Sequence, residues 1–370
     1  MSDVVGLLHE LIRFDSVSAR SNVAVADFCN TRLRDCGFET EAIDYDDRRG
    51  VPKRSIVARR DGASAAQPLA YFGHTDVVPA DEWTGPGGPF EPVVTEGRVY
   101  GRGACDMKGS VAAMLTAAEQ CDAAAYVVLT ADEETGFGGA KSVVAESRLY
   151  RDLLAADARG IIGEPTLGQV VCGHKGGFVW TIEATGTQRH SSFGTDDSAT
   201  LRLLAVLPTL NDLVSEMQSE ERFRDVRFDP PGPTPNVMLA DAAPAINVTS
   251  AKATARVFVR TTPDFPAAEL TDAMRRACER ESVAFRAPDP SPAFFRNADD
   301  PYVRGMCERT GTKRATTVAY GTDACIFGSV PKLVVCGPGG IEQAHTKDEW
   351  IAVDELHRGV ELYASLLQTV

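Results

Sequence analysis

Hydrophobic positions in the first half of the chain follow helical and extended patterns in turn. Apolar side chains recur at helical spacing in residues 3–14, and helices are also predicted at 21–36 and 107–121. Short apolar runs between them predict strands at 55–59, 68–74, 126–130 and 159–163. Strands that alternate with helices at short spacing are typical of an α/β sheet, here a twisted mixed sheet flanked by helices.

The pattern changes near residue 178. The next elements are predicted as a strand at 178–184, a helix at 198–218, strands at 236–239 and 252–260, a helix at 267–281 and a strand from 284. This β-α-β-β-α-β order describes an α+β unit that could fold by itself. Glycines and prolines near 177 and 290 are typical of domain junctions. We therefore predict a discontinuous first domain at 1–177 and 290–370, with a second domain inserted at 178–289.

Composition narrows the class of protein. The chain has 370 residues, 44% hydrophobic residues and a formal net charge of −14. An acidic surface argues against nucleic acid or an anionic membrane as the main partner. The nine cysteines include no C-x-x-C pair, and no apolar run approaches the length of a membrane span. The N-terminus does not have the pattern of a signal peptide, so we expect a cytoplasmic protein.

Two adjacent glutamates raise the question of chemistry. Glu133 and Glu134 follow the apolar run 126–129 almost directly. Like charges so close repel each other and are costly to desolvate. Either a cation neutralises them or one of them takes part in a reaction.

Further ligand-type side chains lie near the ends of predicted strands or in turns. They are His74, Asp76, Asp106, Glu164 and His345. Each has a simple structural alternative, such as a core histidine, a helix N-cap or a turn residue. Together they lie where open α/β sheets build their sites, and their histidine and carboxylate groups suit zinc, manganese or cobalt.

The number of ligands favours two metals. Five ligands are too many for one catalytic zinc with an open position, but they fit two metals that share a bridging carboxylate. One glutamate of the pair would then be neutralised by metal. The other could take a proton from water.

The motifs resemble those of a known family. GHTDVVP, GRGACDMKG, ADEETG, GEPT and QAHTKDEW occur in that order between residues 73 and 350. They resemble the two-zinc superfamily of aminoacylases, acetylornithine deacetylases, succinyl-diaminopimelate desuccinylases and related carboxypeptidases. The C-terminal motif and the segment 163–177 look most like acetylornithine deacetylases.

The resemblance implies a role for each residue of the motifs. His74 and Glu164 would bind one metal, Glu134 and His345 the other, and Asp106 would bridge them. Asp76 would orient His74, and the Asp106–Met107 peptide would be cis. Glu133 would act as the general base and then as the acid that protonates the leaving amine.

The resemblance also assigns the inserted domain as a lid and dimerisation domain, and the first domain as catalytic. His190 would stabilise the oxyanion, usually from the partner subunit of a homodimer. Asn247 and Arg260 would bind substrate, and Asp323 would contact a substrate amine. An exposed loop histidine and an ordinary strand-end arginine are the alternatives at His190 and Arg260. Phe258 stands where the family usually has an aspartate, which leaves substrate identity open.

These observations predict an amidohydrolase with two divalent metals, zinc first and cobalt or manganese next. Its substrate would be a small N-acyl amino acid, N2-acetyl-L-ornithine above others. Within the class the alternatives are N-succinyl-diaminopimelate desuccinylation and a dipeptidase or carboxypeptidase activity. Outside it they are an inactive amino-acid-binding relative and a metal-dependent phosphoesterase. The complete ligand set argues against an inactive relative, and the few basic residues in the motifs argue against phosphate chemistry.

Overall fold

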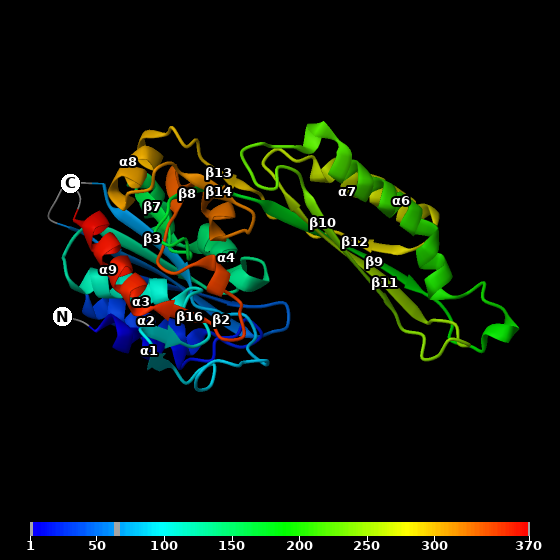
Figure 1. Cartoon of the computed structure of the whole chain (residues 1–370), viewed down its shortest axis with the longest axis horizontal. Coiled ribbons are helices and arrows are strands. Elements are labelled where there is room, and N and C mark those ends of the chain that lie inside the picture. The colour runs from blue at the N-terminus through cyan, green and yellow to red at the C-terminus, as the bar shows by residue number, and fades with distance from the viewer. Residues whose placement is uncertain (1–2, 63–66, 369–370) are drawn as a thin grey trace. The chain divides into compact units, whose positions relative to one another are not determined.

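Strands and helices alternate through the first half of the chain, as the sequence predicts (Figure 1). The computed structural model describes residues 3–62 and 67–368. It separates into two units. Unit 1 comprises Met1–Gly173, Arg296–Thr316 and Thr322–Val370, and unit 2 comprises His174–Phe295 and Thr317–Gly321. The roles predicted for the two domains, catalytic and lid, stay predictions.

A mixed sheet forms the centre of unit 1. Its strand order is β1 (Glu39–Asp46), β2 (Pro52–Arg60), β6 (Ala125–Thr130), β3 (Leu69–His74), β7 (Arg159–Ile162), β15 (Lys332–Val335) and β8 (Val171–His174). Strand β3 runs parallel to both β6 and β7, whereas β1, β2 and β6 pair antiparallel. Every residue of β3 and β6 is buried, as expected of strands covered on both faces. The predicted α/β class is confirmed.

Helices cover this sheet. They are α1 (Val4–Ile12), α2 (Val23–Asp35), α3 (Lys108–Glu119), α4 (Gly138–Glu146), α5 (Arg148–Ala155), α8 (Pro301–Thr310) and α9 (Val353–Leu367). Helix α3 is rich in Gly, Ala and Ser. Because these side chains are small, α1 and α9 can pack closely against the helix, which is almost wholly buried. A small sheet of β16 (Trp350–Ala352), β5 (Arg98–Tyr100) and β4 (Val93–Thr95) also belongs to unit 1.

Unit 2 has the predicted order of elements. It contains β9 (Gly176–Thr185), α6 (Ala199–Ser219), β10 (Thr234–Asp241), β11 (Lys252–Thr261), α7 (Ala267–Arg280) and β12 (Ala284–Arg286). The sheet order is β10-β11-β9-β12, and α6 and α7 lie over one face of it (Figure 1). Burial therefore alternates along β11, with one face packed and the other solvated. Helix α6 keeps Pro208 within it, on its exposed side.

Two short strands lie near the ends of the unit ranges: β13 (Phe294–Phe295) and β14 (Thr316–Val318). Among the described residues, none of the helices is both long enough and apolar enough to cross a membrane.

Candidate active site

The predicted metal ligands gather at one edge of the unit 1 sheet. His74 ends β3 and pairs in register with Thr130, the last residue of β6. Glu164 follows β7, which lies on the other side of β3. The carboxyl ends of parallel strands meet at one edge, so these side chains come together although they are far apart in sequence.

Asp106 lies at the centre of the cluster. Its Oδ1 is 3.1 Å from His74 Nε2, and its Oδ2 is 3.3 Å from His345 Nε2. His345 Nε2 is also 3.1 Å from Glu134 Oε1, and His74 Nε2 is 3.7 Å from Glu164 Oε1. One carboxylate therefore faces two histidine–glutamate pairs, one with each oxygen. The peptide between Asp106 and the next residue is cis, as the resemblance implies.

The backbone orients the His74 ring. Its Nδ1 lies 2.9 Å from the backbone oxygen of Asp76, which can only accept, so Nδ1 carries a hydrogen and Nε2 is the ring nitrogen that faces Asp106. The Asp76 carboxylate is farther away, at 3.7 Å from Nδ1. It accepts instead from Ser18 Oγ at 2.7 Å and from the backbone N–H groups of Glu133 and Glu134 at 3.2 and 3.4 Å. The Asp76 carboxylate therefore positions the backbone of the glutamate pair rather than the His74 ring.

The cluster contains more acidic than basic side chains. Burial raises the pKa of both Glu133 and Glu164 well above the usual value. Burial opposes ionisation of Asp106 too, but hydrogen bonds from His345 and His74 outweigh it and lower the pKa of that carboxyl. Hydrogen bonds to Asp106 and a neighbouring glutamate raise the pKa of His345 to about 10. Carboxylates outnumber positive charges, so the site attracts protons or metal ions.

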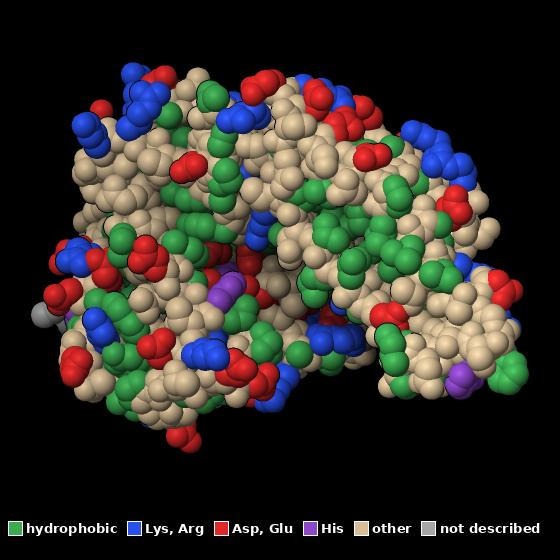
Figure 2. Space-filling model, turned by 45° about the vertical axis from the view of Figure 1, so that its right-hand side comes forward, with side chains coloured by type: hydrophobic (Ala, Val, Ile, Leu, Met, Phe, Trp, Pro, Cys, Tyr) green, Lys and Arg blue, Asp and Glu red, His purple; other side chains and the backbone are tan. Residues whose placement is uncertain are grey.

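The donors present fit divalent metals. Atoms of His74, Asp106 and Glu134 lie within 4.8 Å of one another, and imidazole nitrogen with carboxylate oxygen is a typical donor set for zinc. Acidic side chains gather around a histidine on the face shown in Figure 2. The exposed fraction of the His345 side chain is 53%, whereas His74 is buried, so access is greater on the His345 side.

A buried network that the sequence analysis missed supports the glutamate pair. Asp132 precedes the pair and has a φ of +57°, which non-glycine residues seldom adopt. Its Oδ1 is 2.6 Å from the buried Lys53 Nζ, and its Oδ2 accepts from Tyr45 Oη at 2.8 Å. Lys53 also donates to the backbone oxygens of Ser18 and Arg20, both at 2.8 Å. Only the position of Asp132 inside the ADEETG motif could have signalled this network.

Asp323 is the other predicted residue of unit 1. It accepts a 2.6 Å hydrogen bond from Thr130 Oγ1, at the carboxyl end of β6. Its Oδ1 is buried and has no hydrogen-bond partner among the described residues. Burial raises the pKa of Asp323 to about 6. The predicted contact with a substrate amine stays a prediction.

The remaining predicted residues lie in unit 2. His190 forms a bridge with Val248, and the N–H of Ser191 donates to the backbone oxygen of Asn247, so His190 and Asn247 are neighbours. His190 Nδ1 accepts from the N–H of Ser192 at 3.2 Å, which leaves Nε2–H as a donor. The Arg260 guanidinium lies 4.8 Å from the ring centroid of Phe258. Their predicted roles in catalysis and substrate binding stay predictions.

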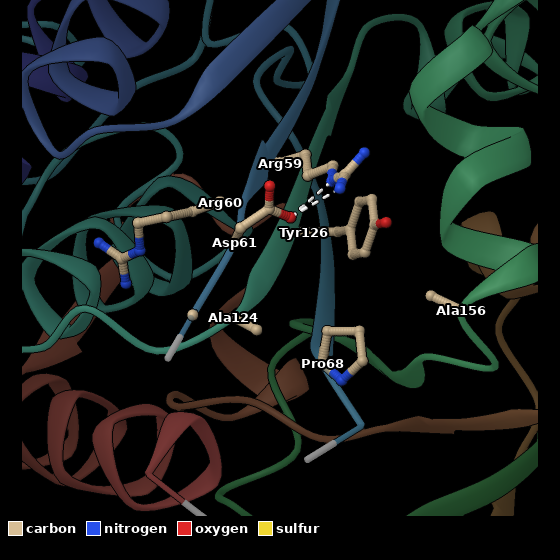
Figure 3. Close-up of a pocket in the computed structure, with 8 residues that line it drawn as sticks. Arg59, Arg60, Asp61, Pro68, Ala124, Tyr126 and Ala156 are labelled. Atoms are coloured by element: carbon tan, nitrogen blue, oxygen red, sulfur yellow. Dashed lines mark hydrogen bonds and ion pairs between the residues drawn. The ribbon is translucent and has the colours of Figure 1, made fainter. Parts of the chain in front are cut away.

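A pocket of about 360 Å³ lies elsewhere in unit 1 (Figure 3). Pro68 and Ala124, which line it, precede β3 and β6. The metal-type ligands follow these same strands, so the pocket lies at the opposite edge of the sheet. An ion pair between Arg59 and Asp61 lies on its wall. It is separate from the candidate active site.

Comparisons with known proteins identify the family of this chain. The model of peptidase family M20/M25/M40 matches residues 70–369. The acetylornithine deacetylase of Myxococcus xanthus is 34% identical over 97% of this chain and 96% of its own length.

Two solved structures share the fold. The M20 family metallo-carboxypeptidase Sso-CP2 of Sulfolobus solfataricus superposes with a TM-score of 0.79 at 17% identity, over 99% of each chain. A Bacillus subtilis protein, YXEP, described as a dinuclear metal binding peptidase from the M20 family, gives 0.65 at 14% identity, over 99% of this chain and 98% of its own. The family resemblance inferred from the motifs is confirmed: the chain belongs to peptidase family M20/M25/M40.

Proposed function

We propose that this protein is a metal-dependent amidohydrolase that removes the acetyl group from N2-acetyl-L-ornithine. The observation that carries the proposal is Asp106, which presents one carboxylate oxygen to His74 and the other to His345, beside Glu134. The near full-length similarity to an acetylornithine deacetylase supports the choice of substrate.

The ligand set divides into two metal positions. His74 and Glu164 would hold one cation, Glu134 and His345 the other, and Asp106 would bind both. When bound, two divalent cations supply a Lewis acid for the amide carbonyl and lower the pKa of water. Zinc is the proposed metal, and metal analysis of the purified protein tests it.

Glu133 is the proposed proton carrier. Its raised pKa suits a group that must gain and lose a proton in one turnover. It accepts a proton from the attacking water as the new C–O bond forms. It then returns that proton to the amide nitrogen as the C–N bond breaks, so acetic acid, which keeps the second proton of the water, and the free amine leave. The hydrogen bond from its backbone N–H to Asp76 holds it in place.

The residues of unit 2 complete the proposal. The Nε2–H of His190 is a suitable donor to the developing oxyanion. Arg260 suits the substrate carboxylate, which it can bind through two parallel hydrogen bonds. Asp323 of unit 1 is proposed to meet the substrate amine. We further propose a homodimer formed through unit 2 and a cytoplasmic location.

A substrate panel with paired variants tests the proposal. The panel contains N-acetylornithine, N-succinyl-diaminopimelate, N-acetylmethionine and a dipeptide, each with zinc-loaded protein. We expect N-acetylornithine to be hydrolysed fastest. Glu133→Gln should lower kcat by about 10²- to 10⁴-fold and keep the metal. Its neighbour Glu134→Gln is the matched control and should lose metal affinity instead.

The results separate substrate from mechanism. Hydrolysis confined to another member of the panel would overturn the substrate and keep the mechanism. Full activity of Glu133→Gln would overturn the proposed proton carrier. Absence of turnover with both metals bound would favour an amino-acid-binding relative.

A further inference from the structure

Glu349 is a buried carboxylate to which the metal-ligand roles assign no function. It lies four residues after His345, directly before β16, and only 1% of its surface is exposed. The donors of all four of its side-chain hydrogen bonds belong to one short segment, residues 102–106. Its Oε1 accepts from the N–H groups of Cys105 at 2.8 Å and Asp106 at 2.9 Å, and its Oε2 from the N–H of Gly103 at 2.9 Å and Arg102 Nη1 at 2.7 Å.

These donors lie just before the N-terminus of α3. The residue that precedes the helix, Met107, makes no side-chain cap hydrogen bond. Buried N–H groups that find no acceptor would each cost about 1–3 kcal/mol. Glu349 satisfies three of them at once, and the positive end of the helix dipole favours its negative charge. The backbone that carries the Asp106 side chain is therefore held by a residue 243 positions further along the chain.

The same residue also anchors the segment that carries His345. The N–H of Gly101 donates to the Glu349 backbone oxygen at 3.1 Å, and Arg102 Nη2 donates to the Thr346 oxygen at 2.9 Å. His345 has a φ of +63°, a conformation that a non-glycine residue keeps only where its surroundings fix it. The hydrogen bonds of Arg102 and Glu349 provide that constraint on the C-terminal side of His345.

We propose that Glu349 is a positioning residue that sets the spacing between Asp106 and His345, and so tunes the affinity of one of the two metal positions. Asp106 Oδ2 and His345 Nε2 are 3.3 Å apart, and each is carried by a segment that Glu349 holds. The position formed by Asp106, Glu134 and His345 depends on this link. The position of His74 and Glu164 depends on it through Asp106 alone. The inference rests on the metal roles given under the proposed function.

The substitution Glu349→Gln probes this link with little change in shape. All four partners of the carboxylate are donors, so the amide nitrogen of glutamine would face an N–H or guanidinium group instead of accepting from it. At least one of the two pairs of hydrogen bonds must then break or shift. The segment that carries Asp106 would lose its fixed distance from the segment that carries His345.

The test measures stepwise zinc binding to metal-free protein by competition with a chelating dye. We expect Glu349→Gln to weaken one of two binding steps by about 10- to 100-fold, the range typical of residues that orient metal ligands. The other step should change less. Because binding is measured directly, failure to hydrolyse N-acetylornithine would leave this result unaffected.

A matched control separates positioning from general destabilisation. Glu41 also accepts backbone hydrogen bonds at a helix start, from Arg148 and Leu149, the first two residues of α5, at 3.1 and 3.0 Å, and one from Ser147 Oγ at 2.6 Å. Glu41→Gln should lower Tm and leave both zinc-binding steps unchanged. If Glu349→Gln does not fold, Arg102→Lys is measured instead. Lysine keeps the charge but cannot make both guanidinium hydrogen bonds, to Glu349 and to the Thr346 oxygen, so the same binding step should weaken.

Two results would overturn the proposal. One is that folded Glu349→Gln binds zinc as tightly as the wild type in both steps. If that variant does not fold, the same result with folded Arg102→Lys would overturn the proposal. The other is an equal loss of affinity in Glu41→Gln, which would show that the effect follows from stability alone.

Discussion

The two units present their polar residues in different ways. In unit 1, His74 and the glutamate pair stand at the ends of strands whose every residue is buried, and backbone groups or a neighbouring carboxylate hold them. In unit 2 helices cover one face of the sheet, and His190 lies in an exposed turn with its hydrogen bonds made to Ser192. A sheet covered on both faces can hold a desolvated, charged cluster at its edge. A sheet covered on one face offers residues that remain accessible.

This difference predicts which measurement each unit affects. Substitutions in the unit 1 cluster should change metal binding and turnover together. Substitutions among the exposed residues of unit 2 should change turnover and leave metal binding intact.

The largest effect is expected from Asp106→Asn. Asparagine keeps the shape but lacks the charge that faces both histidines. Zinc affinity should fall by more than the roughly 10- to 100-fold loss typical of residues that only orient ligands, and turnover should be lost with it. Metal analysis after dialysis and the hydrolysis assay measure both. Retention of two zinc ions per chain would contradict the proposed bridging role of Asp106.

A smaller effect is expected from His190→Ala. Removing one donor to an oxyanion typically lowers kcat by about 10²- to 10³-fold, and zinc content should stay unchanged. Ser192→Ala is the milder control, because it removes the hydroxyl 2.7 Å from Nδ1 but keeps the backbone donor. Light scattering of the same samples tests the proposed homodimer. A monomer with unchanged turnover in His190→Ala would rule out a histidine supplied by the partner subunit.

The smallest effect concerns stability and a buried histidine of unit 2. Burial lowers the pKa of His174 to about 4 and Arg260 adds to the shift, although the hydrogen bond from Nδ1 to the Lys175 oxygen opposes it. Its Nε2 is buried without a partner among the described residues. Above pH 6.5 the histidine is neutral in both states. As the pH falls from 6.5 to 4, His174 takes up a proton only in the unfolded chain. The free energy of unfolding therefore falls by about 3 kcal/mol in total over this range.

His174→Gln provides the comparison for this pH effect. The variant has no group that titrates at this position. Its stability relative to the wild type should therefore rise by about 3 kcal/mol between pH 7.5 and 4, as measured by urea unfolding at each pH. A difference that stays constant across this range would show that His174 titrates normally.

The sequence was most informative where function restricts local residues. His74 and the glutamate pair stand in short motifs beside predicted strands, and Asp106 stands directly before a predicted helix, so their chemistry was readable before their positions were known. The strand β1 was not predicted, because Ile43 is its only buried residue and its other positions are polar or partly exposed. A strand at the edge of a sheet needs few apolar residues, and its pairing partner lies outside any local pattern.

The supporting residues were not readable in this way. Lys53 lies in a strand of mixed polarity, and only its contact with Asp132, 79 positions along the chain, shows what it does. Asp76 was expected to orient His74 through its carboxylate, whereas the backbone oxygen makes the closer contact. Hydrogen bonds between distant segments depend on how the chain folds, and local spacing does not contain that information.

The amino-acid sequence by itself determined the class of fold, the order of elements in the inserted unit and the set of side chains that suit two metal ions. The tertiary structure decided their arrangement: Asp106 faces both histidines, Asp76 holds the glutamate pair and Glu349 links the segment of Asp106 to the segment of His345. The physical reason is that ligand chemistry belongs to individual side chains. Distances and burial arise only when segments far apart in sequence pack together.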